Sequence, residues 1–557
     1  MNKAVILFAL TAFLYAFTGS IPATASDIQP EQNTRLLARD VNVPSNINAQ
    51  QMVVTAHPLA TKAALDTLNQ GGNAADAAIA AQLILGLVEP QSSGLGGGAF
   101  ALYFNAKSRK LYNLDARETA PQSAKEDMFL DANGQPLDFF TASTSKNSIG
   151  LPGVPSLLFT LNQKFGDKSR WPDLFTPAIS YAQNGFAVTP RLADSVAQYQ
   201  NRLKKNHALP YFTKTDGSLI QSGDILRNAQ YAETLSNYRD IGPKFITPHY
   251  RIKSRPNLCA TYRMHYTICS MGEPSSGGLT LLYILRLLDG FDLGSAPNAE
   301  AYHLYLEASK LAFADRNHYM ADPDFVDTPG KALIHPEYLN ERRALISAEH
   351  AQEYTYGHPK NWRGKYPPRH VGPDEGGTTH ISIIDKYGNA ISMTSSIEMA
   401  FGSGYMKDGY FLNNQLTDFS FIPEKDGIKV ANRAEASKRP RSSMSPTIVF
   451  DNNHTPIMVI GSAGGSRIIG YVAQRLIAMI DWGYSANQAL NMPAILARGA
   501  DVEVEQDFPR ALETVLRAKG HNIIRKDLNS GLTAIKKSAA TYEGAADPRR
   551  EGIAIGQ

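Results

Sequence analysis

The chain has 557 residues, of which 43% are hydrophobic and 19% charged, so it is long enough for several layers of structure or two to four domains. Its net charge of +3 is small for this length, and it has no basic run with interleaved aromatic residues. This charge pattern argues against nucleic acid or an anionic membrane as a partner.

The first 25 residues have the pattern of a secretory signal peptide. Lys3 precedes an apolar stretch over residues 4–17, and small residues over 23–25 provide a cleavage signal before Ser26. The apolar stretch is shorter than the roughly 20 residues that span a bilayer as a helix, although an uncleaved anchor is the alternative. We expect a mature chain that is periplasmic or secreted, with no membrane contact after the signal is removed.

Helical patterns dominate the first part of the mature chain. Alanine and leucine at helical spacing over residues 60–68 predict a helix that the Gly71-Gly72 pair ends. An alanine-rich helix over residues 74–87 and a strand over residues 99–104 follow. Three further helices are predicted over residues 155–165, 178–184 and 299–313.

Strand patterns dominate the last third. Residues 378–385 and 390–396 alternate in polarity around a turn at 386–389, which predicts a β-hairpin. The polar, Pro- and Gly-rich segment over residues 356–377 is expected to form an exposed loop before it. A second hairpin and a helix are predicted over residues 447–450, 457–460 and 466–482.

Thr378 stands at the head of the first hairpin, directly after Gly376 and Gly377. Two glycines permit a strained and closely approached backbone, so the Thr378 hydroxyl could attack the carbonyl of Gly377 and cut the chain there. The α-amine freed on Thr378 could then act as the base for its own hydroxyl. A Gly-Gly-Thr run is common at the start of a strand, so this interpretation depends on the surrounding motifs.

Six motifs surround this junction. Their sequences cover Leu114–Pro121, Pro274–Gly278, Ser395–Ser396, Asn413–Asp418, Arg441–Pro446 and Gly461–Arg467. Together, and in this order, they resemble the γ-glutamyltranspeptidase family over nearly the whole mature chain. The resemblance implies an α/β fold of the N-terminal-nucleophile type, an αββα sandwich of two mainly antiparallel sheets between helical layers. It also implies self-cleavage at Gly377–Thr378, into a large fragment (26–377) and a small catalytic fragment (378–557) that stay together as a heterodimer.

The resemblance assigns the catalytic roles to four residues. Thr378 matches the nucleophile, and Ser396 falls where the family usually has a threonine whose hydroxyl steadies it. Gly464 and Gly465 match the backbone N–H donors of an oxyanion hole. Their place between a strand and a helix start also favours developing negative charge, although glycine could be needed there for a tight turn alone.

The resemblance also implies a substrate-binding set. Arg117 matches the arginine that holds the substrate α-carboxylate, a role suited to its planar guanidinium. Ser442 and Ser443 match serines that add hydroxyl donors to the same carboxylate. Gln415 and Asp418 match acceptors for the α-ammonium.

Glu398 departs from the family pattern, because better-known members have an asparagine at this position. With Asp418 it would place two carboxylates beside one cation and favour a substrate that carries an amine. The alternative is that Glu398 turns to solvent or pairs with a basic residue. The segment between Asp418 and Ser442 is where some members carry a lid, and its charged composition also fits an ordinary surface loop.

Cys259 and Cys269 are the only cysteines and lie close together on a predicted hairpin. In an exported chain we expect them to form a structural disulfide. Only His265 lies between them, and no His/Asp/Glu cluster has metal-ligand spacing, so no metal is expected. The glycine-rich loop over residues 94–98 lacks a following Gly-Lys-Ser/Thr, so no nucleotide or other cofactor is expected.

The resemblance implies an enzyme that attacks γ-glutamyl amides such as glutathione through an acyl ester on Thr378. Water, or an amino acid or peptide amine, would then accept the acyl group. One alternative is an amidase like the cephalosporin acylases, which accepts a glutaryl chain without an α-amine; Asp418 argues against it, since an unpaired buried carboxylate is costly. The other is a non-catalytic binding protein on the same scaffold, against which the intact Gly377-Thr378 junction argues.

Overall fold

The computed structural model describes residues 49–364 and 377–557. The predicted signal peptide and most of the loop predicted before Thr378 lie outside these ranges. Within them, none of the helices combines the length and the apolar character needed to cross a membrane.

A seven-stranded antiparallel sheet holds the first predicted hairpin at its centre. The strand order is β22-β1-β9-β10-β2-β3-β6. The strands are β1 (Met52–Thr55), β2 (Gly98–Asn105), β3 (Lys110–Ala116), β6 (Lys253–Arg255), β9 (Gly377–Ile384), β10 (Ala390–Glu398) and β22 (Ile553–Gly556).

A six-stranded antiparallel sheet packs against the first one, in the order β21-β20-β16-β15-β8-β7. Its strands are β7 (Leu258–Tyr262), β8 (Tyr266–Ser270), β15 (Thr447–Phe450), β16 (Pro456–Gly461), β20 (Thr533–Ser538) and β21 (Thr541–Ala546). Cys259 and Cys269 are direct partners on β7 and β8 and form the predicted disulfide.

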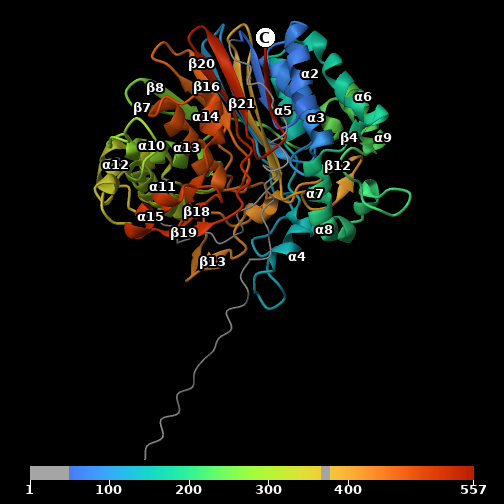
Figure 1. Cartoon of the computed structure of the whole chain (residues 1–557). Helices are drawn as coiled ribbons and strands as arrows, with labels where there is room; N and C mark the ends of the chain where they lie inside the picture. The colour runs from blue at the N-terminus through green and yellow to red at the C-terminus, as the bar shows by residue number, and fades with distance from the viewer. Residues whose placement is uncertain (1–48, 365–376) are drawn as a thin grey trace, which may run out of the picture.

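Helices cover the outer face of each sheet, as Figure 1 shows on its right and left sides. The first layer contains α2 (Pro58–Asn69), α3 (Ala74–Val88), α5 (Val154–Lys164), α6 (Thr176–Asn184), α7 (Pro190–Gln198) and α9 (Ala229–Ile241). The second contains α10 (Ser276–Leu288), α11 (Ala299–Tyr319), α12 (Pro336–Arg343), α13 (Arg467–Ile480), α14 (Ala486–Asn491) and α15 (Arg510–Ala518). The predicted αββα sandwich is confirmed.

Shorter elements lie around this sandwich. They are α4 (Phe139–Ser143), α8 (Gln200–Lys205), the paired strands β4 (Phe186–Ala187) and β5 (Ile225–Leu226), β11 (Met406–Lys407) and β12 (Tyr410–Phe411), β13 (Glu424–Lys425) and β14 (Ile428–Lys429), and a three-stranded sheet of β17 (Ile495–Ala497), β18 (Asp501–Val504) and β19 (Asn522–Arg525).

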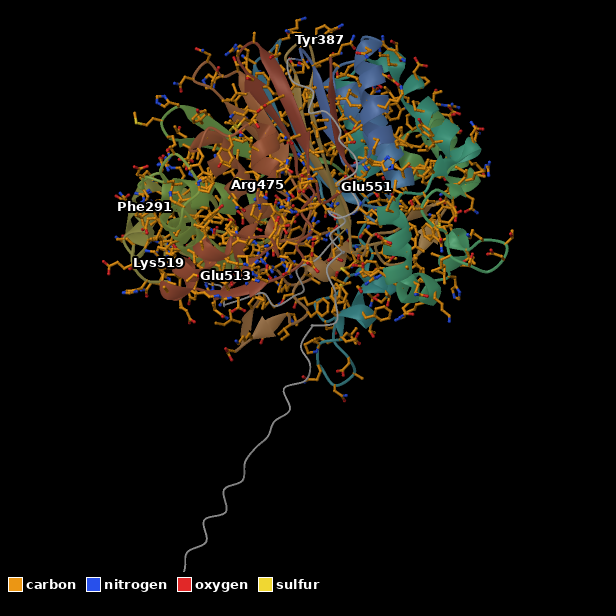
Figure 2. The ribbon with its side chains drawn as sticks, viewed as in Figure 1. Phe291, Tyr387, Arg475, Glu513, Lys519 and Glu551 are labelled. Atoms are coloured by element: carbon orange, nitrogen blue, oxygen red, sulfur yellow. A yellow bond between two sulfur atoms is a disulfide. The ribbon has the colours of Figure 1, made fainter. Side chains whose placement is uncertain are left out.

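The alternation of β9 separates its two faces. Ile381 and Ile383 belong to the apolar cluster beneath α3, whereas His380 and Ser382 face the other sheet. The Ser382 Oγ lies 2.8 Å from Thr533 Oγ1 on β20, so polar side chains connect the two sheets here. Tyr387 marks the β9–β10 turn at the top of Figure 2, and Thr378 therefore lies at the opposite end of the same hairpin.

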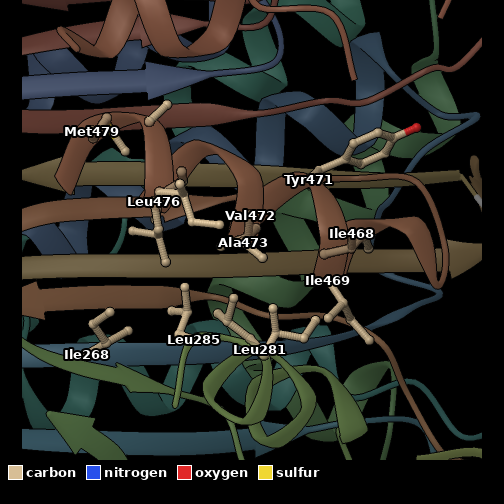
Figure 3. Packing of buried hydrophobic residues seen from close by; sticks show 14 of the residues in the cluster. Ile268, Leu281, Leu285, Ile468, Ile469, Tyr471, Val472, Ala473, Leu476 and Met479 are labelled. Atoms are coloured by element: carbon tan, nitrogen blue, oxygen red, sulfur yellow. The ribbon is translucent and has the colours of Figure 1, made fainter. Parts of the chain in front are cut away.

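The apolar core beneath the second helical layer is continuous. Leu281 and Leu285 of α10 face Val472 and Leu476 of α13 (Figure 3), and all four side chains are buried. Because α13 begins directly after the Gly464-Gly465 turn, this packing also fixes the position of that turn.

Leu281→Ala should lower the free energy of unfolding by about 2–5 kcal/mol, because it removes buried methyl groups and leaves a cavity between α10 and α13. Ile225→Ala is a suitable control, since Ile225 is 56% exposed on β5. Urea unfolding of both variants tests this expectation. Equal destabilisation by the two substitutions would contradict the packing described here.

Candidate functional site

The Thr378 side chain is held by the strand that pairs with its own. Thr378 on β9 lies opposite Ser396 on β10, and its Oγ1 donates to Ser396 Oγ over 3.0 Å. Ser396 Oγ in turn donates to the carbonyl oxygen of Gly377 over 2.8 Å. One hydroxyl therefore connects the Thr378 oxygen with the carbonyl of the peptide bond that precedes Thr378.

A bulge at the end of β10 shapes this arrangement. The register shifts between Ser396 and Glu398, and Glu398 has a φ of 75°, in the left-handed region. Its backbone N–H donates to Ser396 Oγ over 2.9 Å. A Cβ on Gly377 would lie 2.2 Å from the carbonyl oxygen of Gln91, so only glycine fits before the threonine.

Arg117 and Asp418 form an ion pair close to this hairpin. Arg117 follows β3 and is 1% exposed, and its guanidinium also donates to the backbone carbonyls of Pro440 and Arg441 over 3.2 and 3.0 Å. Gln415 Nε2 donates to Asp418 Oδ2 over 2.7 Å. A cation and an anion thus lie side by side, an arrangement complementary to the two charges of an amino-acid zwitterion.

Ser442 and Ser443 follow directly after the two residues whose carbonyls Arg117 holds. Ser442 is buried, and its Oγ accepts a hydrogen bond from the Met444 amide over 3.1 Å. Ser443 is half-buried, and its Oγ accepts one from Arg316 Nη2 over 2.6 Å. The structure therefore brings the predicted carboxylate-binding set together along one stretch of backbone.

Glu398 does not turn to solvent, since it is only 4% exposed and accepts a hydrogen bond from Asn414 Nδ2. Burial and the neighbouring Asp418 carboxylate raise the pKa of Glu398 well above its usual range. The Glu398 and Asp418 carboxylates are thus near each other, and the environment favours the protonated form of Glu398.

Gly464 and Gly465 form the turn between β16 and α13. Their φ angles of 122° and 59° lie in the region that favours glycine, and a Cβ on Gly464 would lie 2.8 Å from the Tyr471 ring. Across residues 49–364 and 377–557, neither amide N–H donates to another group. Both are therefore available to an oxygen anion at the N-terminal end of α13.

Arg550 connects this turn with the nucleophile region. Its Nη1 donates to the backbone carbonyl of Thr378 over 2.8 Å. A Cβ on Gly531 would lie 2.7 Å from Arg550 Nε and 2.9 Å from Ala463 Cβ, so the arginine and the turn both pack against Gly531. The motifs had not assigned a role to Arg550, although the resemblance extends to Asp547-Pro548-Arg549 directly before it.

The segment between Asp418 and Ser442 carries the short β13–β14 hairpin. Lys429 and Arg433 both pair with Glu126, at 2.8 and 3.0 Å. The Phe421 ring stacks on Phe129, with centroids 4.7 Å apart. The segment therefore packs against residues that lie about three hundred positions before it in the chain and on the other side of the proposed cleavage junction.

One group of possible metal ligands, which the sequence analysis had not found, consists of His303, Glu307 and His521, whose ligand atoms lie within 4.8 Å of one another. Lys310 Nζ already donates to Glu307 Oε1 over 2.9 Å and lies 3.3 Å from His521 Nδ1. His303 and His521 also share a hydrogen bond of 2.8 Å. An ammonium group thus occupies the place of a metal cation, and we interpret the group as a hydrogen-bond network.

Comparison with known proteins identifies relatives over nearly the whole chain. The family model described as Gamma-glutamyltranspeptidase matches residues 60–246 and 248–557. The "Glutathione hydrolase proenzyme" of Bacillus subtilis (strain 168) is 34% identical over 98% of each chain, and the protein of that name from Escherichia coli (strain K12) is 34% identical over 90% of each. "Acylase ACY 1 proenzyme" of Pseudomonas sp. (strain SE83) is 30% identical over 90% of this chain and 93% of its own.

Solved structures show the same fold. A cephalosporin acylase from Bacillus halodurans superimposes with a TM-score of 0.80 at 25% identity, covering 93% of this chain and 98% of its own. A γ-glutamyltranspeptidase chain from Helicobacter pylori gives a TM-score of 0.50 at 31% identity, covering 56% of this chain and 94% of its own.

Glu118 allows a test of the electrostatics around Arg117. Burial raises the pKa of Glu118 from 4.5 to about 7, although Arg117 Nη1 lies 3.8 Å away. The folded chain therefore binds this proton more tightly than the unfolded chain, so stability is lost as pH rises from about 4.5 through 7. Glu118→Gln should remove this loss and stabilise the protein by roughly 1–3 kcal/mol at pH 8 but not at pH 4.5.

Urea unfolding at both pH values measures this effect, with the exposed Glu233→Gln as the control. A Glu118→Gln variant whose stability changes with pH in the same way as that of the wild type would contradict the assignment.

Proposed function

The chain belongs to the gamma-glutamyltranspeptidase family, and we propose that it is a self-processed γ-glutamyltransferase and glutathione hydrolase with Thr378 as its nucleophile. The observation that carries the proposal is the hydrogen-bond chain from Thr378 Oγ1 through Ser396 Oγ to the Gly377 carbonyl. Ser396 Oγ thus contacts both the hydroxyl that would attack and the carbonyl that would be attacked.

Self-cleavage would begin at this carbonyl. The hydrogen bond from Ser396 polarises the Gly377 carbonyl, and Thr378 Oγ1 attacks its carbon. The peptide C–N bond then breaks, the hydroxyl proton passes to the Thr378 nitrogen, and an ester replaces the peptide bond. Water then hydrolyses the ester, which separates residues 26–377 from 378–557 and leaves a free α-amine on Thr378. The term "proenzyme" in the names of the bacterial relatives is consistent with such a step.

Turnover would use the same hydroxyl with the new amine as its base. Thr378 Oγ1 attacks the γ-glutamyl carbonyl, and the amides of Gly464 and Gly465 stabilise the oxyanion. The leaving amine takes the proton and departs, which leaves a γ-glutamyl ester on Thr378. Water then yields glutamate, or an amino acid or peptide amine yields a new γ-glutamyl amide.

The paired charges would orient the γ-glutamyl group. Arg117, with Ser442 and Ser443, binds the α-carboxylate, while Asp418 and Gln415 bind the α-ammonium. Because Arg117 and Asp418 are already neighbours, a zwitterion exchanges one ion pair for two and leaves neither charge unpaired. No cofactor takes part in this scheme.

A glutaryl acylase is the second candidate, because two of the relatives and one of the structural neighbours are named as acylases. A glutaryl chain has no α-amine, so it would leave Asp418 without a substrate partner.

The pattern of the first 25 residues supports export, which would place the enzyme in the periplasm or outside the cell with access to glutathione.

Thr378→Ala should give a single uncut chain without activity, because both reactions use the same hydroxyl. A denaturing gel with N-terminal sequencing of the smaller band checks this in the wild type and the variant. Thr379→Val is the matched control, since the buried Thr379 hydroxyl bonds to nothing in the described part of the chain. The nucleophile would have to be reassigned if the alanine variant still split into two fragments.

Glu398→Gln should change how substrate affinity depends on pH. In the wild type, a substrate ammonium favours the ionised form of Glu398. The ratio of KM in the variant to KM in the wild type should therefore grow as the pH rises above the usual carboxyl range. We expect this ratio to reach roughly 3–10-fold for γ-glutamyl p-nitroanilide, on the order of 1 kcal/mol. Glutaryl p-nitroanilide, which lacks the ammonium, is the control substrate.

Steady-state kinetics of the processed enzymes decide the result. Equal changes in KM on both substrates would mean that Glu398 acts through folding rather than through the substrate charge.

A further inference from the structure

The two serines assigned to the substrate carboxylate have a common hydrogen-bond pattern. Ser442 Oγ accepts from the Met444 amide over 3.1 Å, and Ser443 Oγ accepts from Arg316 Nη2 over 2.6 Å. A backbone N–H and a guanidinium can only donate, whereas a hydroxyl has one proton and two lone pairs. Each serine oxygen is therefore fixed as an acceptor on one side, which leaves its proton for a different partner.

Arg316 is itself held in one orientation. It lies in the last turn of α11, is 4% exposed, and its guanidinium carbon lies 5.3 Å from the centroid of the Phe313 ring. Its Nε donates to Ser276 Oγ over 2.9 Å, and Ser276 Oγ donates to the carbonyl of Ser442 over 2.6 Å. Arg316 thus holds the Ser443 side chain directly and the Ser442 backbone through Ser276.

A second arginine holds the other end of the same backbone stretch. Arg117 donates to the carbonyls of Pro440 and Arg441, and Arg441 Nη1 donates to the carbonyl of Arg316 over 3.3 Å. Residues 440–443 therefore lie between two guanidinium groups. One of them, Arg117, is assigned to the substrate, and the other is directed at a hydroxyl with the same assignment.

We infer that Arg316 is a positioning residue that orients the Ser443 hydroxyl as a proton donor to the α-carboxylate of the γ-glutamyl group. It acts through Ser443 and does not touch the substrate. Its fixed positive charge lies behind the hydroxyl and makes that proton a stronger donor toward an anion. This inference rests on the proposed function and extends it, because it makes Arg316 a determinant of the preference for substrates that carry an α-carboxylate.

The test compares two acyl-donor substrates of the processed enzyme. These are γ-glutamyl p-nitroanilide and 4-aminobutanoyl p-nitroanilide, which keeps the amine and lacks the carboxylate. Arg316→Met should raise KM for the first about tenfold while kcat changes less than twofold, and it should leave kcat/KM for the second unchanged. Arg343→Met is the matched control, because Arg343 also donates to backbone carbonyls, those of Leu287 and Arg286.

A double-mutant cycle separates positioning from general destabilisation. Ser443→Ala should raise KM by a similar factor, and adding Arg316→Met to Ser443→Ala should change KM less than twofold. The inference is overturned if the two effects multiply, or if Arg316→Met impairs both donors equally.

Arg316→Lys covers the case in which the methionine variant does not fold. Lysine keeps a donor for Ser443 but cannot serve Ser276 in the same geometry, so KM should lie between the wild-type and Ser443→Ala values. A lysine variant whose KM equals or exceeds that of Ser443→Ala would contradict the inference. Wild-type enzyme without turnover of γ-glutamyl p-nitroanilide would instead refute the proposed function itself.

Discussion

The site depends on the pairing of β9 with β10. This pairing sets Thr378 opposite Ser396, and the bulge that follows lets the Glu398 amide and the Thr378 hydroxyl donate to the same serine oxygen. Because that oxygen then has only its own proton left to give, the proton goes to the Gly377 carbonyl. A shift of one residue in the pairing would turn Thr378 to the opposite face of the sheet and separate these groups.

The residues around Arg117 balance their buried charges in two ways. Arg117 and Asp418 neutralise each other, while burial and the Asp418 carboxylate raise the pKa of Glu398 and so favour its neutral form. Buried charges are costly unless they are paired, so this arrangement lets both signs lie close together without a large desolvation penalty.

Much of the fold could be predicted from the sequence, because periodicity is a local property. Strand alternation in residues 378–396 and the helical pattern over 466–482 predicted β9, β10 and α13 within a few residues. The motifs also led to Ser396, whose hydroxyl accepts the hydrogen bond of Thr378. The sequence could not indicate Arg316 or Arg550, since their roles arise from contacts between segments more than a hundred positions apart. The sequence analysis also missed the group of His303, Glu307 and His521, in which the Lys310 ammonium takes the place of a metal cation.

The order of strands in the two sheets has a consequence for a chain cut before Thr378. Strand β1 lies between β22 and β9 in one sheet, and β8 pairs with β15 in the other, so both sheets join strands from the two sides of the cut. Pulling the fragments apart would break backbone ladders through the middle of the molecule, so partners could exchange no faster than the whole protein unfolds. Two differently labelled populations of processed enzyme, once mixed, would therefore keep their original pairings for as long as they remain native.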